Sequence, residues 1–200
     1  MHTSVRNKLI ALFSVAVALV VAFSYALDSK QQTTSVSEQK RAFPEFTAAK
    51  LVTDELFDSE ALSSEILSYE ILSYETAKLT LADITQHPYQ LVNVWASWCG
   101  ICKTEHAFLL ELQKKGIPIV GLNYRDNPGA ALNVLSNDGN PYSTVISDTQ
   151  GKLALELGVI GTPETYLVDA EGQIVKKLLG VINESVWRKE LAHYFKGTNG

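Results

Sequence analysis

Two cysteines stand three positions apart, in the stretch Trp98-Cys99-Gly100-Ile101-Cys102, and the chain has no others. A disulfide that closes so short a loop removes little entropy from the unfolded chain, so it stabilises a fold poorly. Two intervening residues let the second sulfur reach the first, and the thiolate is the reactive form in disulfide exchange. The spacing therefore predicts a redox-active pair, with Cys99 as the exposed attacking thiol and Cys102 as the partly buried resolving thiol.

Two other interpretations of the cysteines stay open. One is an inert disulfide or a pair of buried thiols. The other is a metal site, because Cys102 and His106 would share a face of a helix close to Cys99, and such ligands suit a soft metal ion such as copper. The only methionine is Met1, so no thioether ligand supports that site. We predict neither a bound metal nor an organic cofactor.

A carboxylate stands in an apolar stripe just after the cysteines. On a helix, Glu105 shares one face with Ile101, Phe108, Leu109 and Leu112. Its side chain would point toward the core behind the cysteines, where burial would raise its pKa into a range useful for proton transfer. We predict a catalytic role for Glu105. The alternative is a carboxylate at the edge of the stripe that reaches water.

A proline directly precedes a predicted strand in Gly161-Thr162-Pro163-Glu164-Thr165. A cis Thr162–Pro163 bond would turn the backbone and present the main chain of Thr162 as an edge for an extended peptide. From the pattern alone, an ordinary trans proline in a loop is the alternative, because cis is the minority form of such bonds.

The elements that must position these groups alternate along the chain. Leu91–Trp95 is an apolar run typical of a buried strand, and the pattern predicts a helix over Cys99–Lys115, ended by Gly116. The first turn of a helix offers free N–H groups and a partial positive charge, which favour a thiolate. Two cysteines between a strand and a helix are a more specific signal of redox chemistry than the same spacing alone.

The rest of the pattern predicts an α/β fold. Further strands are expected at residues 117–123, 143–147, 165–169 and 173–179, and further helical segments at 80–84, 128–136, 152–157 and 183–195. The last two strands form a hairpin, since 170–172 holds turn residues. Such an order indicates a mixed central sheet, with parallel and antiparallel parts, flanked by helices.

The amino-terminal segment predicts the compartment. Leu9–Leu27 contains 19 residues and no charge, and as a helix it would span about 28 Å, roughly the core of a bilayer. Arg6 and Lys8 precede it, so residues 1–8 are expected in the cytoplasm and the main domain outside, behind an N-terminal transmembrane helix. Cleavage of a signal peptide after Ala26 is the alternative. Both interpretations export the domain, which in a bacterium places it in the periplasm.

Composition and local patterning set the domain limits. Residues 28–42 are polar and typical of a linker, and the folded domain is expected over 43–196. An insertion at about 54–76 contains Glu-Ile-Leu-Ser-Tyr twice, with a five-residue period that fits neither a helix nor a strand. With 200 residues, 46% of them hydrophobic, the chain can form one domain with a sizeable core. A net charge of −5 argues against binding to nucleic acid.

Taken together, these motifs resemble the thioredoxin-like superfamily. They are most similar to the membrane-anchored thiol–disulfide oxidoreductases of cytochrome c maturation, the CcmG/DsbE family. The similarity runs from about Phe43 to Phe195, outside the insertion, and its most specific parts are Asn93–Cys99, Glu105-His106, Gly121–Tyr124, Gly139–Tyr142 and Gly158–Asp169. The family usually has Pro-Thr between the cysteines, where this chain has Gly100-Ile101, and this dipeptide tunes the reduction potential.

The resemblance implies a thioredoxin-like fold, a cis Pro163 and an acidic active site with Glu105 and Glu164. It implies that Cys99 and Cys102 reduce a disulfide of apocytochrome c, or serve the haem-attachment machinery, and that a membrane dithiol carrier supplies the electrons. The protein would then be anchored in the bacterial inner membrane with its catalytic domain in the periplasm. Residues expected to contact the client are Trp98, Thr162, Pro163 and Glu164. An exported reductase with another client and a copper metallochaperone are the alternatives.

Overall fold

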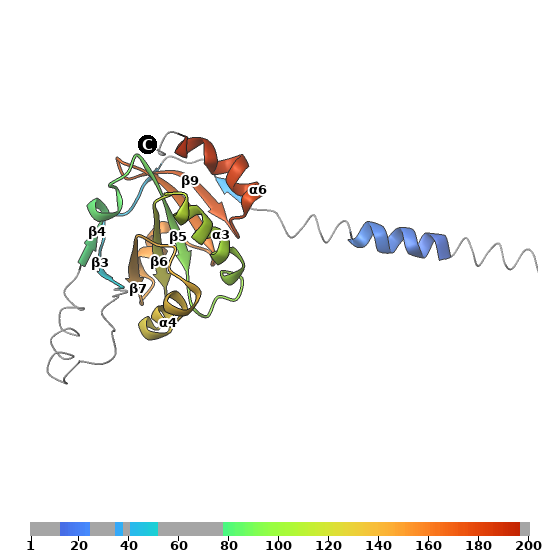
Figure 1. Cartoon of the computed structure of the whole chain (residues 1–200), viewed down its shortest axis with the longest axis horizontal. Coiled ribbons are helices and arrows are strands. Elements are labelled where there is room, and N and C mark those ends of the chain that lie inside the picture. Colours follow the sequence, from blue (N-terminus) through green and yellow to red (C-terminus); the bar gives the residue numbers. More distant parts are fainter. Residues whose placement is uncertain (1–12, 25–34, 38–40, 52–77, 197–200) are drawn as a thin grey trace, which may run out of the picture. The chain divides into compact units, whose positions relative to one another are not determined.

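The computed structural model describes residues 13–24, 35–37, 41–51 and 78–196. The chain divides into two units, Met1–Thr33 and Thr34–Gly200. In the first unit, residues 13–24 form a helix (Figure 1). Its residues are exposed. Within the described ranges, no helix has both the length and the apolar character needed to cross a membrane. The predicted span 9–27 extends beyond the described residues at both ends, and residues 1–8 lie wholly outside them.

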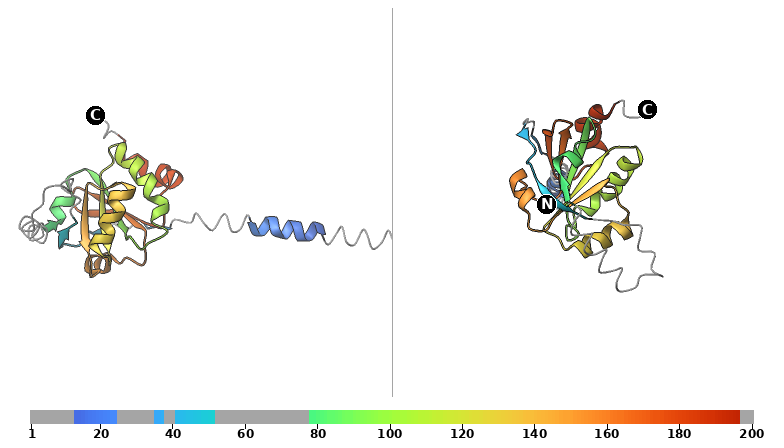
Figure 2. Two further views of the ribbon diagram at one scale, coloured as in Figure 1. Left: turned by 60° about the horizontal axis from the view of Figure 1, so that its bottom comes forward. Right: turned by 90° about the vertical axis from the view of Figure 1, so that its left-hand side faces the viewer.

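The described strands of the second unit form one mixed sheet, in the order β1-β9-β8-β5-β6-β7-β3-β4, and β2 also pairs with β9 (Figures 1 and 2). Their bounds are β1 Ser35–Ser37, β2 Arg41–Ala42, β3 Thr47–Lys50, β4 Lys78–Thr80, β5 Tyr89–Trp95, β6 Ile119–Tyr124, β7 Thr144–Asp148, β8 Glu164–Asp169 and β9 Gln173–Leu179. The central strands β5, β6 and β7 are parallel, whereas β8 runs antiparallel to both β5 and β9. The predicted α/β architecture with a mixed sheet is therefore confirmed.

Helical segments cover both faces of this sheet. They are the 3₁₀ turn η1 (Leu81–Ile84), the helices α3 (Lys103–Lys114), α4 (Pro128–Asp138), α5 (Lys152–Leu157) and α6 (Glu184–Val186), the π-helical turn η2 (Trp187–Leu191) and the 3₁₀ turn η3 (Ala192–Phe195). Buried side chains of α3, α4 and the carboxy-terminal turns join one core cluster, and those of α5 and η1 join the other. Because side chains alternate along a strand, Leu91 and Trp95 of β5 belong to the first cluster and Val92 and Val94 to the second.

Two helices differ from the sequence prediction. The helix after the cysteines begins at Lys103, because the Cys102 N–H bonds to the carbonyl of Cys99 at 3.1 Å and closes a three-residue turn first. The last helix is not continuous: Asn183 caps α6 by accepting a hydrogen bond from the Val186 N–H at 3.0 Å, but the chain then passes through a π turn and a 3₁₀ turn. By contrast, α5 and β9 have the predicted bounds.

Part of the segment expected as a linker is ordered into strands. Residues 35–37 and 41–42 fall within the range 28–42, and both pair antiparallel with β9. The other residues of that range, 28–34 and 38–40, lie outside the described part of the chain. The insertion at 54–76, with its repeat, also lies outside the described residues.

Candidate active site

Four loops leave the sheet at one edge. Trp95 at the end of β5 pairs with Asn123 near the end of β6, and the neighbouring Val94 pairs with Glu164 at the start of β8. Glu164 in turn pairs with Leu179 at the end of β9. The loops 96–102, 125–127, 158–163 and 180–183 must therefore emerge side by side, and the cysteines lie in the first of them.

The two cysteines form a disulfide, with an S–S distance of 2.01 Å and a Cα–Cα distance of 5.4 Å. The backbone N–H of Cys102 also points at the sulfur of Cys99, at 3.1 Å. Cys99 is only 4% exposed and Cys102 7%, so the predicted contrast between an exposed and a buried cysteine is wrong for this disulfide form. The exposed surface belongs instead to the apolar neighbours Trp98 and Ile101, at 58% and 56%. Ile101 is exposed because it lies in the turn before α3 rather than on the buried stripe of the helix.

The loop after β6 holds the segment that leads into Cys99. The carboxylate of Asp126 accepts hydrogen bonds from the backbone N–H of Ser97 and from its hydroxyl, the latter at 2.7 Å. The indole N–H of Trp98 donates to the carbonyl oxygen of Arg125 at 3.1 Å. Sequence reasoning missed Asp126, and the only available signal was an acidic residue just beyond a buried strand.

Glu105 is buried on α3, with 1% of its surface exposed. Its Oε1 accepts a hydrogen bond from the side-chain amide of Asn93 at 2.9 Å, and its Oε2 accepts one from the backbone N–H of Ile182 at 2.8 Å. Burial raises the pKa of Glu105 to about 7, although both hydrogen bonds act in the opposite direction. The alternative of a carboxylate at the edge of the stripe, exposed at the protein surface, is therefore excluded.

Asn93 connects Glu105 to the sheet. Besides its bond to Glu105, its amide donates to the Thr165 hydroxyl at 3.0 Å, and its oxygen accepts from the Tyr142 hydroxyl at 2.9 Å. Burial and the nearby Glu105 charge raise the pKa of Tyr142 well above its usual value, so it stays a donor. The Tyr142 ring stacks on Trp95 with 5.5 Å between centroids. Sequence reasoning gave no role to Asn93 or Tyr142, although both lie in the motifs that carry the family resemblance.

A cavity of about 200 Å³ lies beside Cys102. Its walls include Cys102, Glu105, His106, Trp95 and Tyr142. A space of this size can hold several water molecules, and the polar groups among its largely apolar walls offer them hydrogen bonds. The cavity therefore brings the resolving cysteine and the carboxyl group of raised pKa to one space, through which a proton can pass.

The Thr162–Pro163 bond is cis, as expected. The carbonyl oxygen of Pro163 accepts a hydrogen bond from the Gly180 N–H at 3.0 Å, which ties the loop before β8 to the loop after β9. Pro163 is buried and Thr162 is half-buried.

Glu164 is placed on the opposite face of the sheet from Glu105. It precedes Thr165, whose hydroxyl meets Asn93 on the α3 side, and side chains alternate along β8. The Glu164 carboxylate accepts from the Tyr166 hydroxyl at 2.8 Å and pairs with the Lys177 ammonium at 3.0 Å. Glu164 is not among the residues that line the cavity beside Cys102. The structure therefore does not bring the two acids together.

No support for a metal site comes from the described residues. His106 Nε2 lies 2.9 Å from the carbonyl oxygen of Gly139. Within the described ranges, no group of three or more histidine, cysteine or acidic residues is arranged to hold a metal ion.

The family assignment follows from a comparison with protein families. The Redoxin model matches residues 37–192, which include the cysteines, the cavity and the cis-proline loop. The chain belongs to the Redoxin family. Within this family the site has the two-cysteine redox centre that the sequence predicted.

Curated relatives of this Redoxin chain are bacterial proteins called DsbE. The chain is 51% identical over 112 residues to the probable thiol:disulfide interchange protein DsbE-2 of Pasteurella multocida, covering 56% of this chain and 58% of that protein. It is 46% identical over 119 residues to DsbE of Pseudomonas aeruginosa, covering 60% and 66%. For DsbE of Escherichia coli the identity is 44% over 108 residues, covering 54% and 58%. These matches confirm the resemblance, and they span no more than 66% of the relatives' length.

Solved structures show the same fold. A putative DsbE from Chlorobium tepidum aligns with a TM-score of 0.54 at 23% identity, over 79% of this chain and 99% of that one. A secreted thiol-disulfide isomerase from Corynebacterium glutamicum aligns with a TM-score of 0.59 at 18% identity, over 82% and 93%. At such low identity the likeness is one of fold.

Proposed function

We propose that this protein is a thiol:disulfide oxidoreductase that reduces disulfides of exported proteins, with apocytochrome c as its client during cytochrome c maturation. The observation that carries the proposal is the Cys99–Cys102 disulfide at the shared loop edge, beside a cavity that also contains the Glu105 carboxyl group. The names of the DsbE relatives support the reaction type.

The reaction begins at Cys99. The backbone N–H of Cys102 lies 3.1 Å from the Cys99 sulfur in the disulfide form, and after reduction the same group would stabilise a thiolate there. The thiolate attacks one sulfur of the client disulfide, so a bond forms between Cys99 and the client and the client disulfide breaks. The other client sulfur leaves as a thiolate and takes up a proton from water.

Resolution uses Cys102 and Glu105. With a pKa of about 7, the Glu105 carboxyl group is partly ionised near neutral pH and can accept the Cys102 proton across the cavity. The Cys102 thiolate then attacks Cys99, forming the observed disulfide and releasing the second client sulfur as a thiolate, which takes up a proton from Glu105 or from water. Two electrons pass to the client, and a membrane dithiol carrier restores them.

The proposed location is the periplasmic face of the bacterial inner membrane. Residues 9–27 would anchor the chain, with 1–8 in the cytoplasm, a linker over 28–42 and the catalytic domain over 43–196. The helix at 13–24 supports an anchor because it exposes large apolar side chains, such as Phe13, Leu19 and Phe23, that a bilayer would cover.

Trapping tests the proposed client. With Cys102→Ser, the mixed disulfide at Cys99 cannot be resolved, so we expect a stable adduct with an oxidised peptide that carries the Cys-x-x-Cys-His haem-attachment sequence. Mass spectrometry under non-reducing conditions would show the combined mass and locate the bond at Cys99. Cys99→Ser is the matched control and should give no adduct. No adduct with Cys102→Ser, or an equal yield with unrelated peptide disulfides, would contradict the proposed client.

A further inference from the structure

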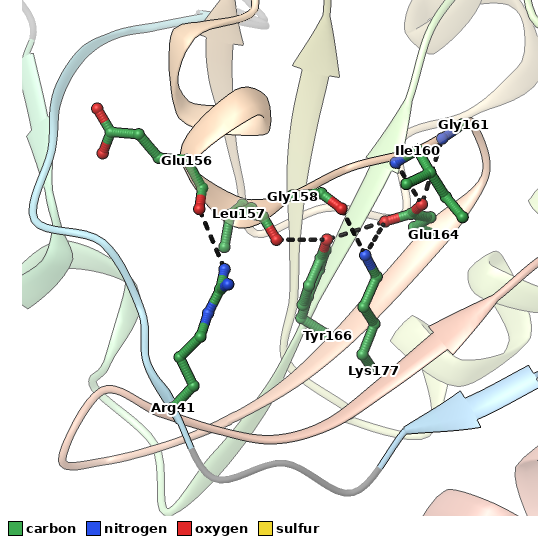
Figure 3. Close-up of polar contacts among 9 residues, drawn as sticks. All are labelled: Arg41, Glu156, Leu157, Gly158, Ile160, Gly161, Glu164, Tyr166 and Lys177. Carbon is green, nitrogen blue, oxygen red and sulfur yellow. Dashed lines mark hydrogen bonds and ion pairs between the residues drawn. The ribbon is translucent and has the colours of Figure 1, made fainter.

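The loop that leads to the cis proline is held through its backbone. From the end of α5 to Gly161, three carbonyl groups and two N–H groups are contacted by side chains from other parts of the fold (Figure 3). The carbonyls of Glu156 and Gly158 accept hydrogen bonds from Arg41 at 3.1 Å and from Lys177 at 2.7 Å, and the Tyr166 hydroxyl lies 3.4 Å from the carbonyl of Leu157. The shape of this loop is therefore set by its surroundings rather than by its own side chains.

Glu164 is the centre of these contacts. Its Oε1 accepts the backbone N–H groups of Ile160 at 2.8 Å and Gly161 at 3.2 Å. Its Oε2 accepts the Tyr166 hydroxyl at 2.8 Å and pairs with the Lys177 ammonium at 3.0 Å (Figure 3). Both oxygens of a buried carboxylate are thus used, and the positive charge of Lys177 balances its negative charge.

Lys177 links the two parts of the loop. Its ammonium group contacts the Glu164 carboxylate, which holds residues 160 and 161, and also the carbonyl of Gly158. Removing this group leaves a buried carboxylate without its cation and a carbonyl without its donor. Either change weakens the backbone contacts that fix residues 158–161.

The loop emerges next to the loop of the disulfide and presents Ile160 outward. Ile160 is 80% exposed, and the exposed Trp98 and Ile101 belong to the neighbouring loop. The two loops leave the sheet next to each other, so a polypeptide whose disulfide is attacked at Cys99 can extend along both of them. A small-molecule disulfide has no polypeptide chain that could contact the loop before the cis proline.

We propose that Glu164 and Lys177 are positioning residues that fix the loop 158–162 for binding of the client polypeptide, without taking part in the sulfur chemistry. This inference rests on the proposed reductase function. It gives Glu164 a role in the shape of the client-binding loop, separate from the proton transfer assigned to Glu105.

Lys177→Met tests the inference, because methionine keeps an apolar side chain of similar length and loses the ammonium group. The full chain in detergent is reduced and mixed in a single turnover with either an oxidised haem-attachment peptide or a small aromatic disulfide. We expect the half-saturating peptide concentration to rise about tenfold, with the limiting rate changed less than about twofold. The rate with the small disulfide should also change less than about twofold.

Lys176→Met is the matched control. Lys176 is the adjacent residue of β9 and forms an ion pair of similar length, 3.1 Å, with Glu190. It points to the carboxy-terminal turns rather than to the cis-proline loop. Its replacement should therefore leave the half-saturating peptide concentration, and the rates with both substrates, as they are in the unaltered chain. Glu164→Gln is the second variant: its oxygen can still accept the two N–H groups, but its NH2 group replaces the oxygen that accepts from Tyr166 and pairs with Lys177, so we expect the half-saturating concentration to rise here too.

The outcomes separate the inference from the proposed function. If the unaltered chain reduces neither substrate, the reductase function fails. If it reduces both, and Lys177→Met binds the peptide as the unaltered chain does, or slows both substrates in parallel, the positioning role is overturned. If Lys177→Met does not fold, Glu164→Gln decides by the same criteria.

Discussion

Replacing Cys99 with serine is expected to lower the rate of peptide disulfide reduction by at least about 10³-fold, because the removal of a nucleophile typically costs this much or more. A serine hydroxyl remains protonated at neutral pH and cannot form the sulfur–sulfur bond of the intermediate. The remaining Cys102 is only 7% exposed and lies on the cavity side of the turn. The measurement is the appearance of free peptide thiols, followed by alkylation and mass spectrometry.

Cys102→Ser is the comparison for this variant. It keeps the first attack, so mixed disulfide should form at a rate close to that of the unaltered chain, while release of reduced peptide is lost. Both variants should unfold at similar denaturant concentrations, since each lacks the same disulfide. Reduction that continues in Cys99→Ser would mean that Cys102 can attack clients, and the assigned order of the two cysteines would be wrong.

Glu105→Gln is expected to change how stability depends on pH. The pKa of Glu105 is about 7 in the folded protein and 4.5 in the reference state, so between these values the folded state holds more protons than the unfolded one. The free energy of unfolding contributed by Glu105 therefore falls as pH rises from about 4.5 to about 7, by roughly 3 kcal/mol in total. Glutamine cannot ionise, so between pH 4 and pH 8 the difference in stability between the two proteins should shift by about 3 kcal/mol in favour of the variant.

Urea denaturation of both proteins across this pH range provides the measurement, with the difference between them as the result. Glu190→Gln is a control of opposite sign, because Lys176 holds the pKa of Glu190 below its usual value. The stability that Glu190 contributes is present above its unfolded pKa and is lost as pH falls, and it should be small at this partly exposed site. A difference between Glu105→Gln and the unaltered protein that stays constant with pH would show that the carboxyl group does not ionise in this range.

The same substitution separates a catalytic role from a structural one. If Glu105 accepts the Cys102 proton, the release of reduced peptide should show an inflection near pH 7, and Glu105→Gln should remove it while leaving formation of the mixed disulfide unchanged.

Local patterns in the sequence predict the elements better than their contacts. The start of β9 is predictable because the turn residues at 170–172 separate it from β8, and α5 ends where Gly158 takes a left-handed conformation with φ of 68°. The start of α3 is not predictable in the same way, because a turn between Cys99 and Cys102 has the same apolar pattern as a first helical turn.

The contacts of the site residues depend on which strands and loops pack next to them, and the sequence alone does not show this. Every residue of β8 is buried, so no alternation reveals which face Glu164 occupies, and its partner Lys177 is known only once the β8–β9 register is known. The burial of Glu105 follows from its stripe on α3, but its contacts with Asn93 and Ile182 depend on the packing of α3 against β5 and the loop after β9. Asp126 acts on Ser97, 29 positions earlier in the chain, and no local pattern reports such a contact.

The reduction potential of the Cys99–Cys102 pair tests the proposed direction of electron flow most directly. The full chain is equilibrated in buffers with known ratios of reduced to oxidised glutathione, and the fraction of disulfide is read from Trp98 fluorescence and checked by alkylation. A periplasmic reductase must hold its electrons at lower potential than the compartment's oxidants, so we predict a value below about −180 mV. A value near about −120 mV, which is typical of a strong disulfide-forming oxidant, would show that the protein makes disulfides rather than reducing them.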